Sequence, residues 1–476
     1  MMHPSLPRID LTQTVCAIAT PPGSGGLGIV RISGPDAIVI GDRVFHGRVR
    51  LPDQPGFSVH HGYFHDPATN RDIDEVLATI FRSPKSFTSE DLVEFSAHGG
   101  RVILNRIIDV LTDNGATLAV AGEFTLRAFL NGRIDLTEAE AIADLIAAKT
   151  EESAAAALRQ LKGALLSEVQ ELRKGVMAAL ASLEIGIDFT EEDISQTERL
   201  DVAARLANLA DRIESLLSGY QRGRILRDGF TVVLAGPPNV GKSTLFNRLA
   251  QDEHAIVTDI PGTTRDVLRE YMNLRGWPVC IVDTAGLRES ADFIEQIGIR
   301  KTSEAVGRAD GVIWITDALQ DLHHQLPPQS VAGASIPYLI CLNKIDLMPD
   351  PESFIDQAVV SLAESRPLST NAPIIGISAK TGQGIESLLE HIHHWISDSG
   401  VERKTADLTI NERHHTALKS ALESIRSASQ SISSGCEIEL IAFDAKNAAG
   451  ALGEIIGETT TEEILGEIFA NFCIGK

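Results

Sequence analysis

Residues 236–243 read Gly-Pro-Pro-Asn-Val-Gly-Lys-Ser, a glycine-rich loop that ends in Gly-Lys-Ser. An apolar run, residues 231–235, precedes the loop, and residues 244–249 have the composition of a helix. This order is typical of phosphate-binding loops, in which backbone N–H groups and a helix N-terminus face the phosphates. We expect Lys242 to reach the β- and γ-phosphate oxygens and Ser243 to ligate Mg²⁺. The pattern predicts a nucleoside triphosphate site in an α/β domain.

Three further motifs follow in order, each after an apolar run rich in β-forming residues: Asp283-Thr284-Ala285-Gly286, Asn343-Lys344-Ile345-Asp346 and Ser378-Ala379-Lys380. Asp283 is expected to orient Mg²⁺ through water, and Gly286 lets the backbone approach the γ-phosphate closely. Asp346 can accept two hydrogen bonds from guanine, which adenine cannot supply. The four motifs together predict a guanine-nucleotide-binding domain that prefers GTP over ATP.

The base is expected to contact three more groups. Asn343 would meet the edge of the base, the stem of Lys344 its face, and the amide of Ala379 its O6 atom. Including the segment between the first two motifs, the predicted nucleotide-binding residues are Asn239, Val240, Gly241, Lys242, Ser243, Thr244, Thr258, Asp259, Ile260, Pro261, Gly262, Thr263, Thr264, Asp283, Thr284, Ala285, Gly286, Asn343, Lys344, Asp346, Ser378, Ala379 and Lys380.

Length and composition limit what surrounds this domain. A chain of 476 residues is too long for one hydrophobic core, so we expect three domains. No apolar run reaches the length of a membrane span and the start lacks a signal-type segment, which predicts a cytoplasmic protein without membrane contact. The five cysteines, Cys16, Cys280, Cys341, Cys436 and Cys473, are scattered singly with no Cys-x-x-Cys pair and predict neither a disulfide framework nor a zinc site, and four are expected to be small buried residues.

The net charge of −23 repels phosphates over most of the surface, so any RNA contact needs a local basic patch or a partner. Residues 1–133 alternate apolar and polar positions in short runs, which predicts an α+β domain. Residues 134–224 carry leucines and valines at steps of three and four from Leu158 to Leu183, which predicts one long helix with an apolar stripe. The nucleotide domain is expected over 225–396, and renewed helical spacing over 397–476 predicts a second part of the same helical domain.

The segment 258–266, Thr-Asp-Ile-Pro-Gly-Thr-Thr-Arg-Asp, resembles switch I of bacterial translation-factor-class GTPases, with Thr264 closing on Mg²⁺. Ribosome-assembly GTPases of the Era and Der kinds share this segment. The ends of the chain are more specific: residues 19–34, residues 122–133 and the terminal Phe-Cys-Ile-Gly-Lys closely resemble the tRNA-modifying GTPase family MnmE, also called TrmE. The resemblance covers essentially the whole chain.

This resemblance implies a function. The family, with an FAD-dependent partner (MnmG, also called GidA), adds a carboxymethylaminomethyl or aminomethyl group to C5 of the tRNA wobble uridine. A tetrahydrofolate derivative, 5,10-methylene- or 5-formyl-tetrahydrofolate, donates the carbon. The family pattern places folate near Arg31, Glu94, Arg133 and Lys476 in the N-terminal domain, and it implies a homodimer that joins the partner in a heterotetramer or larger assembly. Cys473 then becomes a candidate nucleophile or acid/base group.

The hydrolytic machinery departs from the Ras pattern, because Leu287 stands where Ras-type enzymes keep a water-orienting glutamine. The resemblance implies that Asn239, with switch I atoms of Thr258, Ile260 and Thr263, holds K⁺, and that Glu295 positions the attacking water during G-domain pairing. Two alternatives stay open at this point: a ribosome-assembly GTPase switch of the Era/Der type, and a scaffold whose docking is timed by GTP.

Overall fold

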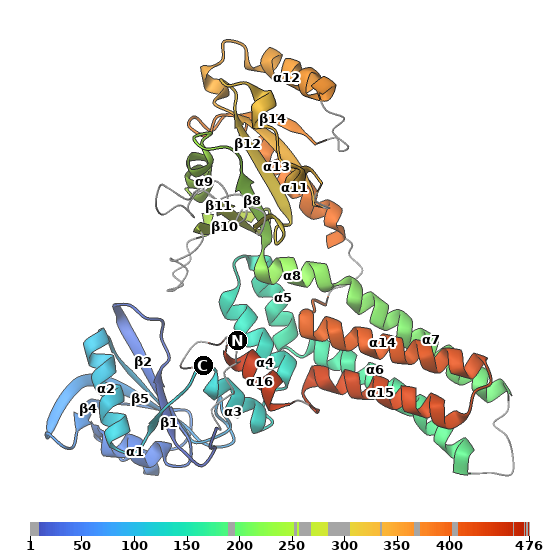
Figure 1. The fold of residues 1–476 in the computed structure, drawn as a ribbon. Helices are drawn as coiled ribbons and strands as arrows, with labels where there is room; N and C mark the ends of the chain where they lie inside the picture. Colours follow the sequence, from blue (N-terminus) through green and yellow to red (C-terminus); the bar gives the residue numbers. More distant parts are fainter. Residues whose placement is uncertain are drawn as a thin grey trace. The chain divides into compact units, whose positions relative to one another are not determined.

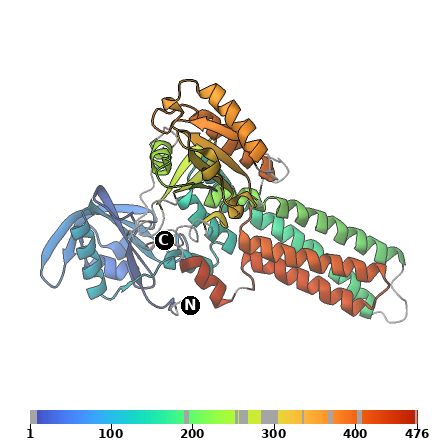
Figure 2. The ribbon, with the colours of Figure 1, turned by 45° about the horizontal axis from the view of Figure 1, so that its top comes forward.

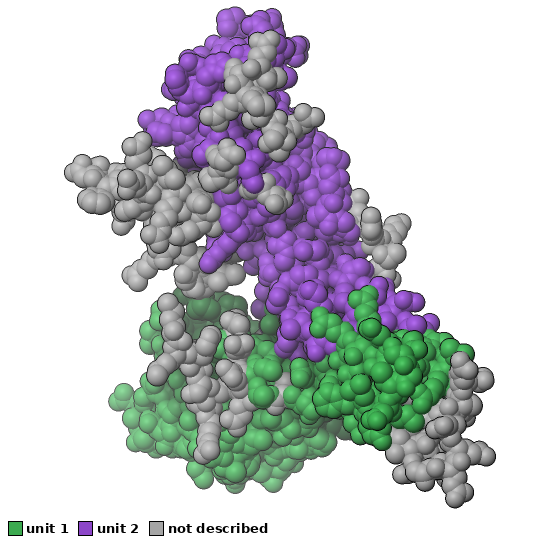
Figure 3. All heavy atoms as spheres, turned by 45° about the vertical axis from the view of Figure 1, so that its right-hand side comes forward, with its two compact units in different colours: residues 1–143, 161–206, 423–476 green, residues 144–160, 207–422 purple. Residues whose placement is uncertain are grey.

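The computed structural model describes residues 9–188, 196–251, 255–256, 268–283, 305–333, 336–365, 372–401, 408–459, 461–470, 472 and 475. The chain forms two compact units, shown in Figure 3. Unit 1 contains Met1–Ala143, Leu161–Leu206 and Glu423–Lys476, and unit 2 contains Asp144–Gln160 and Ala207–Leu422. None of the helices in these described ranges is both long enough and apolar enough to cross a membrane.

Unit 1 begins with a seven-stranded sheet in the order β3-β4-β5-β6-β2-β1-β7 (Figure 1). Its strands are β1 (Val15–Ile18), β2 (Gly25–Ser33), β3 (Phe45–Gly47), β4 (Ser58–Asp66), β5 (Arg71–Phe81), β6 (Leu92–Gly99) and β7 (Thr117–Leu118). All neighbours run antiparallel except β1 and β7. Helices α1 (Ala37–Arg43) and α2 (Arg101–Asp113) share one hydrophobic core with this sheet.

The expected alternation is visible along β2. Val30 and Ile32 are fully buried in the core shared with α1 and α2, whereas Ile29 and Arg31, which alternate with them, are half-buried. Because successive side chains of a strand point to opposite faces, Arg31 belongs to the face that does not pack on this core. The predicted α+β fold of the N-terminal segment is confirmed.

The remaining helices of unit 1 come from both sides of the nucleotide-domain sequence. They are α3 (Glu123–Leu130), α4 (Leu136–Ala147, which crosses the unit boundary), α6 (Ala164–Asp188), α15 (Ile438–Ile456), α16 (Glu462–Ala470) and parts of α7 (Gln196–Ser218) and α14 (Glu412–Ser433). Asp135 and Glu138 begin α4 with a reciprocal cap, in which each side chain accepts the other's backbone N–H at 3.2 and 2.9 Å. Helices α6 and α15 lie side by side in both views (Figures 1 and 2), and Arg173 of α6 donates to the carbonyl of Ala449.

The prediction of one long helix from Leu158 onward is wrong in one respect. The chain forms α5 (Glu151–Leu161) and α6, separated at Lys162 and Gly163, and Gly163 has a positive φ of 81°. Glycine adopts this backbone conformation without steric cost, so it ends a helix that the leucine spacing alone would continue. Leu158 is 41% exposed, while the apolar stripe of α6 is buried at Leu165, Val169, Leu172, Val176 and Leu180.

Unit 2 contains the second sheet, in the order β14-β13-β12-β8-β11-β10-β9. Its strands are β8 (Phe230–Ala235), β9 (Ala255–Ile256), β10 (Leu268–Leu274), β11 (Trp277–Asp283), β12 (Gly311–Asp317), β13 (Tyr338–Asn343) and β14 (Ile374–Ile377). The five strands from β14 to β11 are parallel. Helices α9 (Lys242–Ala250) and α13 (Ile385–Ile396) pack on one face, and α11 (Gln329–Ala332) and α12 (Pro351–Ser365) on the other.

Helices on both faces of a parallel sheet make the predicted Ras-like α/β layout, and the multidomain α/β and α+β fold class is confirmed. The basic segment before this sheet is also helical, as α8 (Tyr220–Asp228). Of the described cysteines, Cys16, Cys280 and Cys341 are buried as predicted, whereas Cys436 is half-buried. Burial raises the pKa of Cys16 to about 12 and raises the pKa values of Cys280 and Cys341, so these thiols are unreactive.

Candidate functional site

The predicted phosphate-binding loop, residues 236–243, is called the phosphate-type loop below, and two glycines fix its backbone. Gly236 has φ +144°, and a Cβ there would lie 2.1 Å from the carbonyl oxygen of Ile315 in β12. Gly241 has φ +98°, and its Cβ would lie 2.3 Å from Nδ2 of Asn343. Both the backbone angle and the close approach exclude any other residue without displacement of a neighbour. The loop between β8 and α9 is thereby fixed against the ends of two neighbouring strands.

Lys242 and Ser243, the first residues of α9, point into this loop region. Lys242 is 6% exposed, and its Nζ donates to the carbonyls of Gly236 at 2.9 Å and Pro237 at 2.6 Å. Ser243 Oγ donates to Oδ2 of Asp283 at 2.9 Å, and Asp283 is fully buried at the end of β11. A hydroxyl beside a carboxylate is a pair of hard oxygen ligands, so these residues fit the predicted Mg²⁺.

Asn343 joins three segments. It is 3% exposed; its Nδ2 donates to the Val240 carbonyl at 2.8 Å, and its Oδ1 accepts the Ala379 backbone N–H at 3.0 Å. The phosphate-type loop, the end of β13 and the loop after β14 are therefore tied through one buried amide. Sequence reasoning assigned Asn343 and the Ala379 amide to the guanine base and missed this bond between them, so the base contacts stay a prediction.

Lys344 has φ +71° and lies beside the same loop. Its Nζ bonds Oδ2 of Asp317 at 2.6 Å and the Asn239 carbonyl at 3.3 Å. Asp317 ends β12 and its side chain is only 4% exposed, yet sequence reasoning did not single it out. The sequence did contain a signal for Asp317, because this carboxylate follows six residues, 311–316, that are apolar or carry a hydroxyl. Asp346, in contrast, is exposed, as a base-binding carboxylate must be.

The sheet register explains why these residues meet. Asp283 is opposite Leu234 of β8, Asp317 is opposite Asn343, and Asn343 is opposite Ile377. Parallel strands end at the same edge of the sheet, and this edge is where ligands bind in open α/β sheets. The first, third and fourth predicted motifs and Asp283 of the second are therefore gathered at one edge.

A second candidate site lies in unit 1, on the face of β2 and β6 that carries Arg31. Arg31 and Glu94 are cross-strand partners, with Nε and Nη2 of Arg31 2.8 and 2.7 Å from Oε1 of Glu94. The guanidinium of Arg31 also lies 5.6 Å from the ring centre of Phe87 and donates to the carbonyl of Gly475 at 3.2 Å. Two of the four predicted folate residues, Arg31 and Glu94, are thus brought together, and the carbonyl of Gly475 lies beside them.

Arg133 completes this arrangement. Its guanidinium lies 5.7 Å from the ring centre of Phe87 and donates to the carbonyl of Ser86. Phe87 therefore contacts both predicted folate arginines, a role that sequence reasoning missed because a lone phenylalanine in a loop carries no signal. Within the described residues, the buried Ser86 Oγ has no hydrogen-bond partner. An aromatic ring, a carboxylate, two guanidinium groups and an unpaired hydroxyl fit a folate, which has a flat ring system and carboxylates.

Several predicted residues lie outside the described residues: Thr258, Asp259, Ile260, Pro261, Gly262, Thr263, Thr264, Thr284, Ala285, Gly286, Glu295, Cys473 and Lys476.

Two family models match the chain. The GTP-binding protein TrmE N-terminus model matches residues 14–133, and the MnmE helical domain model matches residues 136–473. The chain belongs to the MnmE family. It is 41% identical to the tRNA modification GTPase MnmE of Carboxydothermus hydrogenoformans, over 98% of this chain and 100% of that protein. It is 43% identical to the protein of the same name from Symbiobacterium thermophilum, over 98% and 99% of the two chains.

Among solved structures, the chain is similar to the FeoB G-domain from Methanococcus jannaschii, with 25% identity over 36% of this chain and 98% of that one. The TM-score of 0.25 is too low to support a structural argument. The fold assignment rests on the sheet order and the family models.

Proposed function

We propose that this chain hydrolyses GTP and, with an FAD-dependent partner of the MnmG type, adds a carboxymethylaminomethyl or aminomethyl group to C5 of the wobble uridine of certain tRNAs. The observation that carries the proposal is the sheet edge where the phosphate-type loop, Asp283, Asn343 and Ala379 meet. This edge occurs in a chain that is about 40% identical, over nearly its whole length, to proteins named tRNA modification GTPases.

At this edge each residue has a chemical task. Lys242 exchanges its two loop carbonyls for β- and γ-phosphate oxygens, and the exposed carboxylate of Asp346 selects guanine. Ser243, Asp283 and Thr264 would hold Mg²⁺, and Oγ of Ser243 and Oδ2 of Asp283 already lie 2.9 Å apart. Bound Mg²⁺ supplies positive charge that stabilises the phosphoryl oxygens during hydrolysis.

The monovalent cation is part of the same proposal. Asn239 is exposed and has a left-handed backbone with φ 62°. Its side-chain oxygen, with groups of Thr258, Ile260 and Thr263, would hold K⁺ beside the phosphates. Glu295 would position the attacking water. Pairing of two G domains would complete this arrangement.

The folate donor belongs to unit 1. Glu94, held in place by Arg31, would accept paired donors of the pterin ring, and Arg133 and Lys476 would meet the carboxylates. Bound tetrahydrofolate supplies the one-carbon unit. Cys473 would act beside it as a nucleophile or acid/base group.

The proposed domains are a folate-binding and dimerisation domain over 1–133, a helical domain over 134–224 and 397–476, and a G domain over 225–396. The packing of α6 on α15 supports a helical domain built from both sides of the G domain. We place the protein in the cytoplasm as a homodimer.

Calorimetric titration of the full chain with 5-formyltetrahydrofolate tests the proposal, with GTP titrated in parallel. Saturable binding of both ligands is expected. Normal GTP hydrolysis without folate binding would contradict the modification chemistry and favour an assembly switch of the Era/Der type or a scaffold. Absence of GTP binding would contradict the proposal as a whole.

A further inference from the structure

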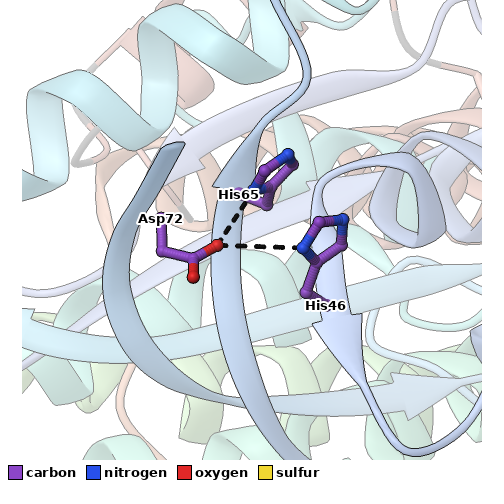
Figure 4. Close-up of side chains that lie close together, drawn as sticks. All are labelled: His46, His65 and Asp72. Carbon is purple, nitrogen blue, oxygen red and sulfur yellow. Dashed lines mark hydrogen bonds and ion pairs between the residues drawn. The ribbon is translucent and has the colours of Figure 1, made fainter. Parts of the chain in front are cut away.

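Two histidines and one aspartate converge on the edge of the unit 1 sheet, away from the folate face residues. His46 is on the edge strand β3, His65 on β4 and Asp72 on β5 (Figure 4). The ligand atoms of the three side chains all lie within 4.8 Å of one another. Across the ranges that the structure describes, no other group of three histidines, cysteines or carboxylates comes this close together.

The strand register brings these side chains to one face. His46 is opposite Tyr63, two residues before His65 on the same strand, so both histidines point to the same side of the sheet. Asp72 is opposite His65 because the register of β5 shifts between Phe64 and His65. Without that bulge, Ile73 would stand opposite His65 and Asp72 would point to the other face.

The distances suit one metal ion. Asp72 Oδ1 lies 2.9 Å from Nδ1 of His65 and 3.8 Å from Nδ1 of His46. Around a tetrahedral zinc, with bonds of about 2.0–2.2 Å, ligand atoms lie roughly 3.4 Å apart, between these two values. The simpler explanation is an ordinary hydrogen bond between Asp72 and His65. That bond does not explain why a second imidazole, that of His46, lies beside the same carboxylate oxygen.

One adjustment is required. The imidazole rings of His46 and His65 are stacked, with centroids 3.6 Å apart and planes 21° from parallel. Metals bind imidazole near the ring plane, so one ring must turn before both nitrogens can share an ion. The His46 side chain is 55% exposed whereas that of His65 is 7% exposed, so His46 is the ring with room to turn.

We propose that His46, His65 and Asp72 bind one Zn²⁺, with the fourth position open to water. Two imidazoles and one carboxylate form a ligand set that zinc accepts, while Mg²⁺ prefers oxygen ligands and would not compete. His46 also borders a surface pocket of about 770 Å³ whose lining includes Arg48, Arg50, His61 and Tyr63. The side chains of His46 and Asp72 are each about half exposed, so the open position is reached from solvent. The ion would link the short edge strand β3 to β4 and β5.

The test is zinc titration of the full-length, untagged chain after treatment with EDTA and desalting, with a chromophoric chelator as competitor. The unmodified chain is expected to bind one equivalent that His46→Ala and Asp72→Asn each weaken at least about tenfold. His98→Ala is the matched control: His98 is an exposed histidine on β6 bonded to a carboxylate, Asp74, at 2.7 Å, and it does not line the pocket beside His46. It should bind zinc as the unmodified chain does.

Both test positions are about half exposed, so neither substitution opens the core, and far-UV circular dichroism verifies folding. Co²⁺ in place of zinc gives a second readout, because a four-coordinate site produces a visible absorption band that His46→Ala should remove. Equal zinc affinity in His46→Ala and His98→Ala, or no saturable equivalent in the unmodified chain, would overturn the proposal.

Discussion

Replacement of Asn343 by alanine tests the buried tie between three loops. The substitution removes the hydrogen bonds to the Val240 carbonyl and the Ala379 N–H, which are 2.8 and 3.0 Å long. An unsatisfied buried polar group costs about 1–3 kcal/mol, and water entering the vacated space recovers part of that. We therefore expect unit 2 to lose about 2–4 kcal/mol of unfolding free energy.

Tryptophan fluorescence isolates this effect. All three tryptophans of the chain, Trp277, Trp314 and Trp395, lie in unit 2, so their signal in urea reports its unfolding alone. With an m-value of about 3 kcal/mol/M, the midpoint should fall by roughly 1 M. GTP affinity should fall as well, because the loop positions depend on the tie.

The control is Asn247→Ala, an exposed asparagine on α9. Asn343→Asp separates the two bonds: it keeps an acceptor for the Ala379 N–H but sets a carboxylate oxygen against the Val240 carbonyl. It should therefore be no more stable than Asn343→Ala. A midpoint for Asn343→Ala within about 0.2 M of the Asn247→Ala control would refute the reasoning.

Further outcomes concern the proposed chemistry. Asp346→Asn should shift preference from GTP towards xanthosine triphosphate, and unchanged GTP affinity would remove Asp346 from the base site. Glu94→Ala should weaken folate binding by about 1.5–3 kcal/mol in calorimetry, while Glu75→Ala in the same sheet should not. If Glu94→Ala weakened folate binding and GTP binding equally, the variant would be misfolded. Cys473→Ser should keep GTP turnover but lower tRNA modification severely, and full modification would exclude a chemical role. K⁺ should stimulate hydrolysis at least about tenfold over Na⁺ at matched ionic strength, and Asn239→Ala should abolish that response; equal rates in both salts would defeat the cation site.

Local patterns were sufficient to predict several elements. The strands β2 and β6 and the helix α2 follow from period-two and period-3.6 spacing, because each of these elements buries one face. The strand β8 follows from a continuous apolar run, because it is buried on both faces. The order of the nucleotide motifs was enough to predict a guanine-nucleotide-binding α/β domain. The structure then showed that the strands from β14 to β11 are parallel and that the described motif residues meet at their carboxyl edge. The continued leucine spacing across Gly163 misled the prediction, because the backbone angle of one residue outweighed the spacing there.

What the sequence by itself determined is the set of chemical groups and the elements that carry them, because spacing and turn residues act over a few positions. Only the tertiary structure decided which distant groups meet. Arg31 and Glu94 pair through the register of strands 63 positions apart, and Asp72 faces His65 because of a one-residue bulge. Asn343 binds Val240 and Ala379 because three loops end at one sheet edge. Such contacts depend on register and strand order, which the energy of the whole packed sheet selects.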